Sequence, residues 1–83
     1  MRQPVKMESM RIRNKMVAEE IGLSESGVWY IRHGRRFPRF ETMEAIAAAY
    51  KWPVADQVEV RDNYAEAFNA RLVEHYARVG IHG

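Results

Sequence analysis

Cysteine is absent from this chain of 83 residues, which excludes a disulfide framework and a thiolate metal site. No apolar run approaches the roughly 18 residues that a membrane-spanning helix needs, and no signal peptide is visible. We therefore expect a soluble, cytoplasmic protein with no membrane attachment. Because a chain of this size is near the lower limit for folding on a single core, packing or oligomerisation must supply its stability.

Patterns that carry catalysis or ligand binding are equally scarce. The histidines, His33, His75 and His82, are scattered, with no pair at metal-ligand spacing and no base beside a nucleophile. No glycine-rich phosphate loop is present. The sequence therefore predicts no enzyme and no bound cofactor, metal or small-molecule substrate.

Charge is divided unevenly along the chain. Residues 1–39 hold nine Lys/Arg and four Asp/Glu, a charge of +5, whereas residues 40–83 hold four and seven, a charge of −3, consistent with the overall +2. This asymmetry suggests one face for a polyanion and another face for something else.

Between residues 14 and 33 the apolar pattern predicts two short amphipathic helices joined by a tight turn. Gly22 breaks the pattern, because glycine ends a helix in a left-handed conformation at little cost. Leu23 fills the corner, and Ser24 is a suitable N-cap for the second helix. The apolar positions around the break are Val17, Ala18, Ile21, Val28 and Ile31. This is the pattern of a helix-turn-helix, with helices at about 14–21 and 25–33.

Helices are also predicted on either side of this pair. One begins near Pro4, which suits a first helical turn, and ends at residue 10 or 11. Ile12 then covers the core between this helix and the next. Another spans about residues 41–50 and ends before Trp52-Pro53, because a proline disfavours helix at the preceding residue.

A basic loop links the helix-turn-helix to the helix at residues 41–50. Gly34 is expected to end the preceding helix in a left-handed conformation. Phe37 and Phe40 flank Pro38, and we expect both rings to anchor the loop to the core.

From Val54 to Val79 the pattern allows two interpretations. Apolar residues keep three- and four-residue steps, which fits one long helix. However, residues 58–60 are rich in β-branched side chains, and Asp62-Asn63 is a capping pair. We favour a short helix from about residue 55, followed by a second from Asp62 to Val79.

These residues resemble the phage repressor/Cro type of helix-turn-helix domain. The likeness lies in the run from Val17 to Val28, then Ile31 and Gly34, and then the positions of that family's fourth helix and the following turn, Pro38, Phe40, Met43, Ile46, Ala47, Tyr50 and Trp52-Pro53. It covers residues 6–58, about two-thirds of the chain. The resemblance implies an all-α bundle of five short helices, with a DNA-binding domain at residues 1–60 and a C-terminal helix within the same compact unit at residues 61–83.

The second helix of such a motif reads base edges in the major groove. The helical period turns one face outward, and the resemblance assigns base reading there, giving the set Glu25, Ser26, Gly27, Trp29, Tyr30 and His33. Glu25 either accepts from a cytosine amino group or stabilises the helix N-terminus. Gly27 either lets the backbone approach the groove or merely weakens the helix. Trp29 either covers thymine methyl groups, which we favour, or folds onto the loop at Phe37.

Affinity is expected to come from contacts with DNA phosphates. By resemblance, Asn14 and the N-terminus of its helix hold a phosphate. Arg32 stands where the family commonly has an acidic residue, and it is expected to add a DNA contact. The other basic residues around the motif complete the set, Arg13, Lys15, Arg35, Arg36 and Arg39.

The C-terminal segment carries a stripe of apolar residues at four-residue spacing, Tyr64, Phe68, Leu72 and Tyr76. Such a stripe either completes the core or forms a dimer interface. Members of the family bind two half-sites as symmetric dimers, and the family-like core is complete without this segment. We therefore favour a homodimer interface.

Together these features predict a sequence-specific transcriptional regulator that binds double-stranded DNA. It would be a repressor of phage or mobile-element type, occupying a pseudo-palindromic operator as a homodimer at the nucleoid. Two alternatives remain open. An excisionase-like DNA-bending factor would need strands after Arg36, and a protein-interaction module, such as an antitoxin or antirepressor, would hold a protein with its acidic C-terminal helix.

Overall fold

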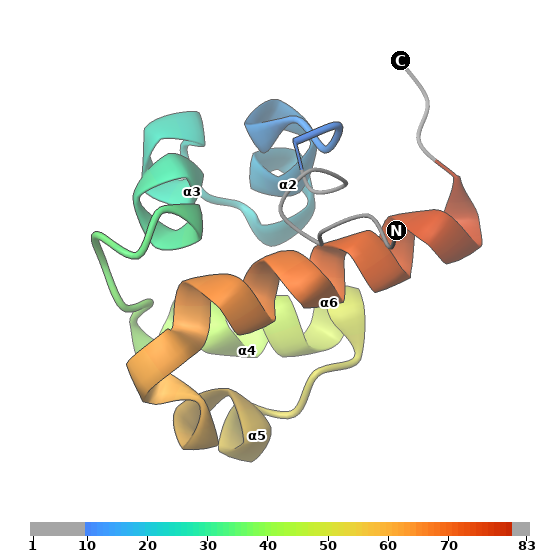
Figure 1. Ribbon diagram of the computed structural model, residues 1–83. Helices are drawn as coiled ribbons and strands as arrows, with labels where there is room; N and C mark the ends of the chain where they lie inside the picture. The colour runs from blue at the N-terminus through green and yellow to red at the C-terminus, as the bar shows by residue number, and fades with distance from the viewer. Residues whose placement is uncertain (1–9, 81–83) are drawn as a thin grey trace, which may run out of the picture.

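The computed structural model describes residues 10–80, and every regular element within this range is a helix (Figure 1). The elements are α2 (Asn14–Ile21), α3 (Glu25–Arg32), α4 (Phe40–Tyr50), α5 (Val54–Glu59), a 3-10 turn η1 (Arg61–Asn63) and α6 (Tyr64–Val79). This confirms the all-α prediction. The helix expected from residue 4 lies outside the described residues, apart from its end, where Met10 and Arg11 form a turn.

The pair α2 and α3 forms with the predicted bounds, except that α3 ends one residue earlier. Gly22 lies at φ 71° and ψ 37°, and its amide donates to the Ala18 carbonyl at 2.8 Å. Only glycine adopts this conformation without strain, so α2 ends there. Ser24 then caps α3, because its hydroxyl accepts from the Gly27 amide at 3.1 Å.

The loop after α3 reverses the chain toward α4. Gly34 lies at φ 72°, as predicted, and the Arg35 amide donates to the Tyr30 carbonyl at 2.8 Å. Phe37 packs edge-on against Tyr64, with 5.2 Å between the ring centroids. Phe40, by contrast, is 59% exposed, because it is the first residue of α4 and its side chain points outward. The prediction that both rings anchor the loop is therefore wrong for Phe40.

Residues 54–79 form two helices, as we favoured, with η1 between them. The apolar pattern that would suit one long helix requires Val58 to face the core, but Val58 is 47% exposed. The fully buried residue of α5 is Gln57. The pattern pointed to the wrong side chain because α5 faces the core with a polar residue.

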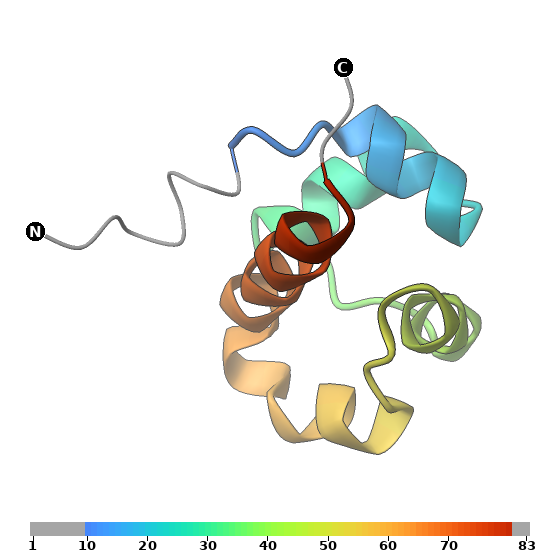
Figure 2. The ribbon, with the colours of Figure 1, turned by 90° about the vertical axis from the view of Figure 1, so that its right-hand side faces the viewer.

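The core is closed by α6, which packs against α3 and α4. Figure 2 views α6 nearly along its axis, with α2 and α3 above it and α4 to its right. The stripe residues Tyr64, Phe68, Leu72 and Tyr76 are all buried in the monomer, in one cluster with side chains from α2, α3 and α4. The prediction that they form a dimer interface is therefore wrong. The physical reason is that α2 to α5 leave an apolar face uncovered until α6 lies on it.

Within residues 10–80, no helix is both long enough and apolar enough to cross a lipid bilayer. Over the same residues, no three acidic, histidine or cysteine side chains gather at a distance suited to a metal ion.

Candidate functional site

The outward face of α3 carries most of the predicted base-reading residues. Glu25, Ser26 and His33 are exposed, and the larger rings are exposed as well, Trp29 by 38% and Tyr30 by 40%. The buried residues of the helix are Gly27, Val28 and Ile31, which form the opposite face. The helix is thus amphipathic in the predicted sense, and its open side includes two aromatic rings.

These rings form an ordered cluster with basic side chains of the following loop. Trp29 stacks on His33, with 4.2 Å between the centroids and 26° between the planes. Its ring meets Tyr30 edge to face at 5.3 Å. The Arg35 guanidinium lies 5.8 Å from the Trp29 centroid, and that of Arg36 lies 4.8 Å from the Tyr30 centroid, both within cation–π range. We call these five residues the aromatic-basic patch.

A groove runs along one edge of this patch, between α3 and the start of α2. Its volume is about 630 Å³, and Trp29, His33 and Glu25 line the α3 side. Arg13 and Lys15 line the opposite side, at the N-terminus of α2. The fold therefore brings the three predicted phosphate-binding residues that precede α3, Arg13, Asn14 and Lys15, to the same groove as three predicted base-reading residues.

Arg32 makes hydrogen bonds within the chain that the sequence does not predict. Its Nε donates to Asn69 Oδ1 at 2.7 Å, and its Nη1 donates to the Ile12 carbonyl at 2.6 Å and to Asn14 Oδ1 at 2.9 Å. Asn69 Nδ2 also donates to the Arg32 carbonyl at 3.0 Å. The side chain is half-buried, and this desolvation lowers the pKa of Arg32 from its ordinary value.

Arg32 therefore ties the end of α3 to α6 and to the start of α2, and its contact with a phosphate stays a prediction. The Asn14 side-chain oxygen accepts one of these bonds, whereas a phosphate would need the Asn14 Nδ2 group, which donates. No local pattern predicts the clamp, because Asn69 is 37 residues from Arg32 in the chain.

Gly27 is also placed differently from the prediction. It is buried, and a Cβ atom at this position would lie 3.0 Å from Leu23 Cγ and 3.1 Å from the Ser24 hydroxyl. The close approach that requires glycine is made by the turn between α2 and α3. Gly27 therefore serves the packing of the turn, and its assignment to base reading is wrong.

Three further predicted phosphate-binding residues, Arg35, Arg36 and Arg39, are exposed after α3. Arg39 is the residue before α4, where its side chain makes no capping hydrogen bond. Arg35 and Arg36 reach back over the rings of α3, so the basic loop and the open face of α3 form one surface.

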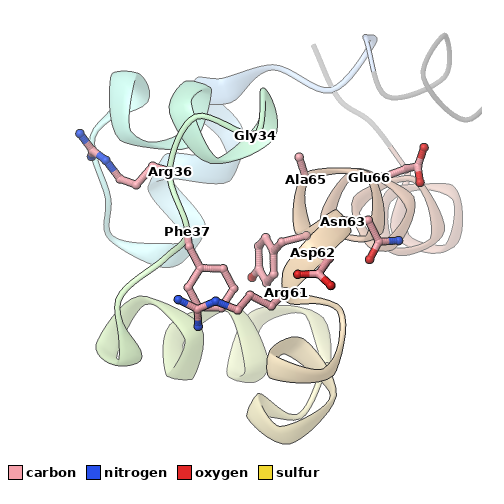
Figure 3. A pocket seen from close by; sticks show the side chains of 9 residues that line it. Gly34, Arg36, Phe37, Arg61, Asp62, Asn63, Ala65 and Glu66 are labelled. Carbon is pink, nitrogen blue, oxygen red and sulfur yellow. The ribbon is translucent and has the colours of Figure 1, made fainter.

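A smaller hollow of about 320 Å³ lies between the loop at residues 34–37 and the start of α6. Figure 3 shows the side chains that line it. Phe37 and Arg61 lie at its floor, with the Arg61 guanidinium 4.4 Å from the Phe37 centroid. Asp62 projects into it, whereas the guanidinium of Arg36 extends away. Because cationic and anionic groups line it together, this hollow has no clear preference for the charge of a ligand.

A polar cluster that the sequence does not predict joins α2, α4 and α6. The Tyr76 hydroxyl donates to the Glu20 carboxylate, and it lies 3.2 Å from the Tyr50 hydroxyl. His75 Nε2 lies 3.9 Å from Glu20 Oε1. Burial raises the pKa of Tyr76 to about 12, and it also raises the pKa of Tyr50 from its ordinary value. The cluster fixes the last turn of α2 to α6.

Comparison of the chain with protein families, with curated proteins and with solved structures finds no match.

Proposed function

We propose that this chain binds double-stranded DNA sequence-specifically, with α2 and α3 as a helix-turn-helix and α3 entering the major groove. The observation that carries the proposal is the open face of α3, where Glu25 and Ser26 lie in the first turn and basic residues flank the helix. Base edges are read by side chains at the start of such a helix, and phosphates are held by the charges around it.

The groove beside α3 supports the same function. Arg13 and Lys15 stand at the N-terminus of α2, where helix amides and positive side chains together favour a phosphate. Arg35 and Arg36, whose guanidinium groups lie near the Trp29 and Tyr30 rings, provide further positive charge beside the same helix.

In this function the chain is a transcriptional repressor of phage or mobile-element type, located at the nucleoid in the cytoplasm. It occupies a promoter by binding a pseudo-palindromic operator as a homodimer. Because the stripe on α6 is used inside the monomer, the two copies meet through another surface, and sedimentation of the free protein tests whether they do.

The excisionase-like alternative is not supported. It requires strands after Arg36, whereas residues 40–50 form α4 and no strand occurs in residues 10–80. The protein-interaction alternative keeps one feature in its favour, the exposed carboxylates Glu66 and Glu74 on α6. Tight binding to a protein, without binding to any duplex, would establish it in place of the DNA-binding proposal.

The test is a selection from random-sequence duplex DNA at two salt concentrations. We expect an enriched inverted repeat with half-sites about one helical turn apart. Weak and salt-sensitive binding without an enriched motif would instead indicate an architectural protein. The absence of duplex binding at both salt concentrations would refute the proposal.

Two variants locate the interface. Arg36→Ala should weaken binding to all duplexes and reduce the slope of log Kd against log salt concentration by about one for each phosphate that is no longer bound. Ser26→Ala should instead change which sequence is preferred. Arg78→Ala is the matched control, because Arg78 is exposed in the last turn of α6, outside both the patch and the groove. If Arg36→Ala and Arg78→Ala have equal effects, the placement of the interface is wrong.

A further inference from the structure

The aromatic-basic patch is unusual for a surface that meets a polar ligand. Two large rings, Trp29 and Tyr30, are exposed side by side on one helix face, although a small chain gains stability by burying such rings. Their contacts are with each other, with His33 and with two arginines of the neighbouring loop. Exposed apolar groups gathered in this way mark a binding surface.

The rings are held in place before any ligand binds. Trp29 is fixed by the stack with His33 and by the edge contact with Tyr30, and Arg36 lies over the Tyr30 ring. A side chain that is already ordered loses less conformational entropy on binding. The patch can therefore contribute apolar contacts with little loss of conformational entropy, and it carries positive charge at its border.

Duplex DNA offers few apolar features to such a patch. In the major groove the base edges display hydrogen-bond donors and acceptors, and the exception is the methyl group at C5 of thymine. A cytosine methylated at C5 presents the same group. Aromatic carbon makes favourable contact with a methyl group, whereas it cannot satisfy a carbonyl, an amino group or a ring nitrogen.

Resting on the proposed function, we propose that Trp29 and Tyr30 form a platform for the C5-methyl groups of pyrimidines in the major groove. The specificity of α3 then has two parts. Glu25 and Ser26, in its first turn, provide hydrogen bonds, and the platform selects sites that carry methyl groups at the facing steps.

The geometry favours a paired duplex over stacking on unpaired bases. One face of the Trp29 ring is covered by His33, and an Arg36 guanidinium lies over Tyr30. A base that stacked on these faces would have to displace those groups. Methyl contact needs only the exposed part of each ring, so it leaves the cluster intact.

The experiment uses the full chain and the duplex that is enriched from random DNA. That duplex is remade with deoxyuridine in place of thymidine, which removes the C5-methyl groups and keeps every hydrogen-bonding group. We expect binding to weaken roughly fourfold for each methyl group that the platform covers, the value for burial of one aliphatic carbon. A third duplex, with 5-methylcytosine in place of each cytosine of the enriched sequence, adds C5-methyl groups without changing any base pair. Tighter binding to it would show that the platform also accepts methylated cytosine.

Protein variants assign the effect to the platform. Trp29→Ala should bind the thymidine and deoxyuridine duplexes with nearly equal affinity. Phe40→Ala is the matched control, because Phe40 is also an exposed ring but lies at the start of α4. It should keep the full preference for methylated duplex.

The outcomes are distinct. If the unmodified protein binds both duplexes equally, the methyl platform is refuted and sequence-specific DNA binding stands. If Trp29→Ala and Tyr30→Ala both keep the full preference, the methyl contact lies elsewhere and the platform is again refuted. Tighter binding to the separated strands than to the duplex would refute it in favour of base stacking. If no duplex binds at all, the proposed function itself fails.

Discussion

Replacement of Gln57 by leucine tests the most unexpected feature of the core. Gln57 is completely buried, and its amide makes three hydrogen bonds. Nε2 donates to the Met43 carbonyl at 2.9 Å and to the Trp52 carbonyl at 2.8 Å, while Oε1 accepts from the Tyr64 hydroxyl at 2.7 Å. One side chain therefore joins α4, the turn after it, and the start of α6.

The expected loss follows from what leucine leaves behind. Gln57→Leu keeps a similar volume, so the cavity term is small, but three buried polar groups lose a partner. A buried group left unpaired costs about 1–3 kcal/mol. The Met43 carbonyl is cheaper to release, because it also accepts within α4. We expect the free energy of unfolding to fall by about 2–4 kcal/mol, out of roughly 4–12 kcal/mol for a chain of this length.

Thermal and urea unfolding, followed by circular dichroism, measure this change. A loss of that size corresponds to a fall of roughly 10–30 °C in Tm. Val58→Ala is the matched control on the same helix, since its side chain faces solvent and should change stability by less than about 0.5 kcal/mol. The double variant Gln57→Leu/Tyr64→Phe should recover part of the loss, because the unpaired hydroxyl is then removed as well.

Two results would refute the reasoning. If Gln57→Leu is no less stable than Val58→Ala, the hydrogen bonds of Gln57 do not hold the core together. If Tyr64→Phe adds its full effect to that of Gln57→Leu, the two side chains are not coupled.

Two further predictions concern the contacts of α6. Asn69→Ala removes the acceptor of Arg32 Nε and the donor to the Arg32 carbonyl, so it should lower the free energy of unfolding by about 1–3 kcal/mol. The exposed α6 variant Glu66→Ala should be nearly neutral in the same urea titration, and equal effects would contradict the role of the clamp. Burial raises the pKa of Tyr76 to about 12, and it also raises the pKa values of Tyr50 and Tyr64. The folded state therefore holds the hydroxyl protons of these tyrosines more tightly than the unfolded state does. The stability they confer is complete below about pH 10 and should fall as pH rises from there through about 12, because only the unfolded chain ionises in that window. Urea unfolding between pH 8 and pH 12 measures this, and a Tyr76→Phe variant that loses stability with the same slope would contradict the assignment of Tyr76.

The turn between α2 and α3 was predicted from local residues, and the structure agrees with it. Gly22 ends α2, Ser24 caps α3, and Gly34 ends the turn that follows α3. Each of these effects operates within four residues along the chain, so it is encoded where it occurs. The outward face of α3 was predicted for the same reason, since helical period alone decides which side chains oppose Val28 and Ile31.

The errors share one cause, which is that the sequence does not identify the group that a given side chain contacts. The stripe on α6 was correctly identified as apolar, but the sequence does not say whether the same chain or a second copy covers it. Arg32 was expected at a phosphate for its charge, and its hydrogen bonds with Asn69 were not predicted. Gly27 was expected at the groove, whereas it is buried, and a Cβ atom there would press closely on the side chain of Leu23.

The sequence by itself therefore determined the positions of α2, α3 and α4, the glycine and serine that end α2 and cap α3, and the outward face of α3, because these follow from backbone conformation and from spacing within a few residues. Only the tertiary structure decided how α6 closes the core, which polar groups are buried and which rings remain exposed. Those outcomes depend on contacts such as Arg32 with Asn69 and Tyr76 with Glu20, 37 and 56 residues apart in the chain. The free energy of such contacts is set by the desolvation and packing of both partners, which no single stretch of sequence contains.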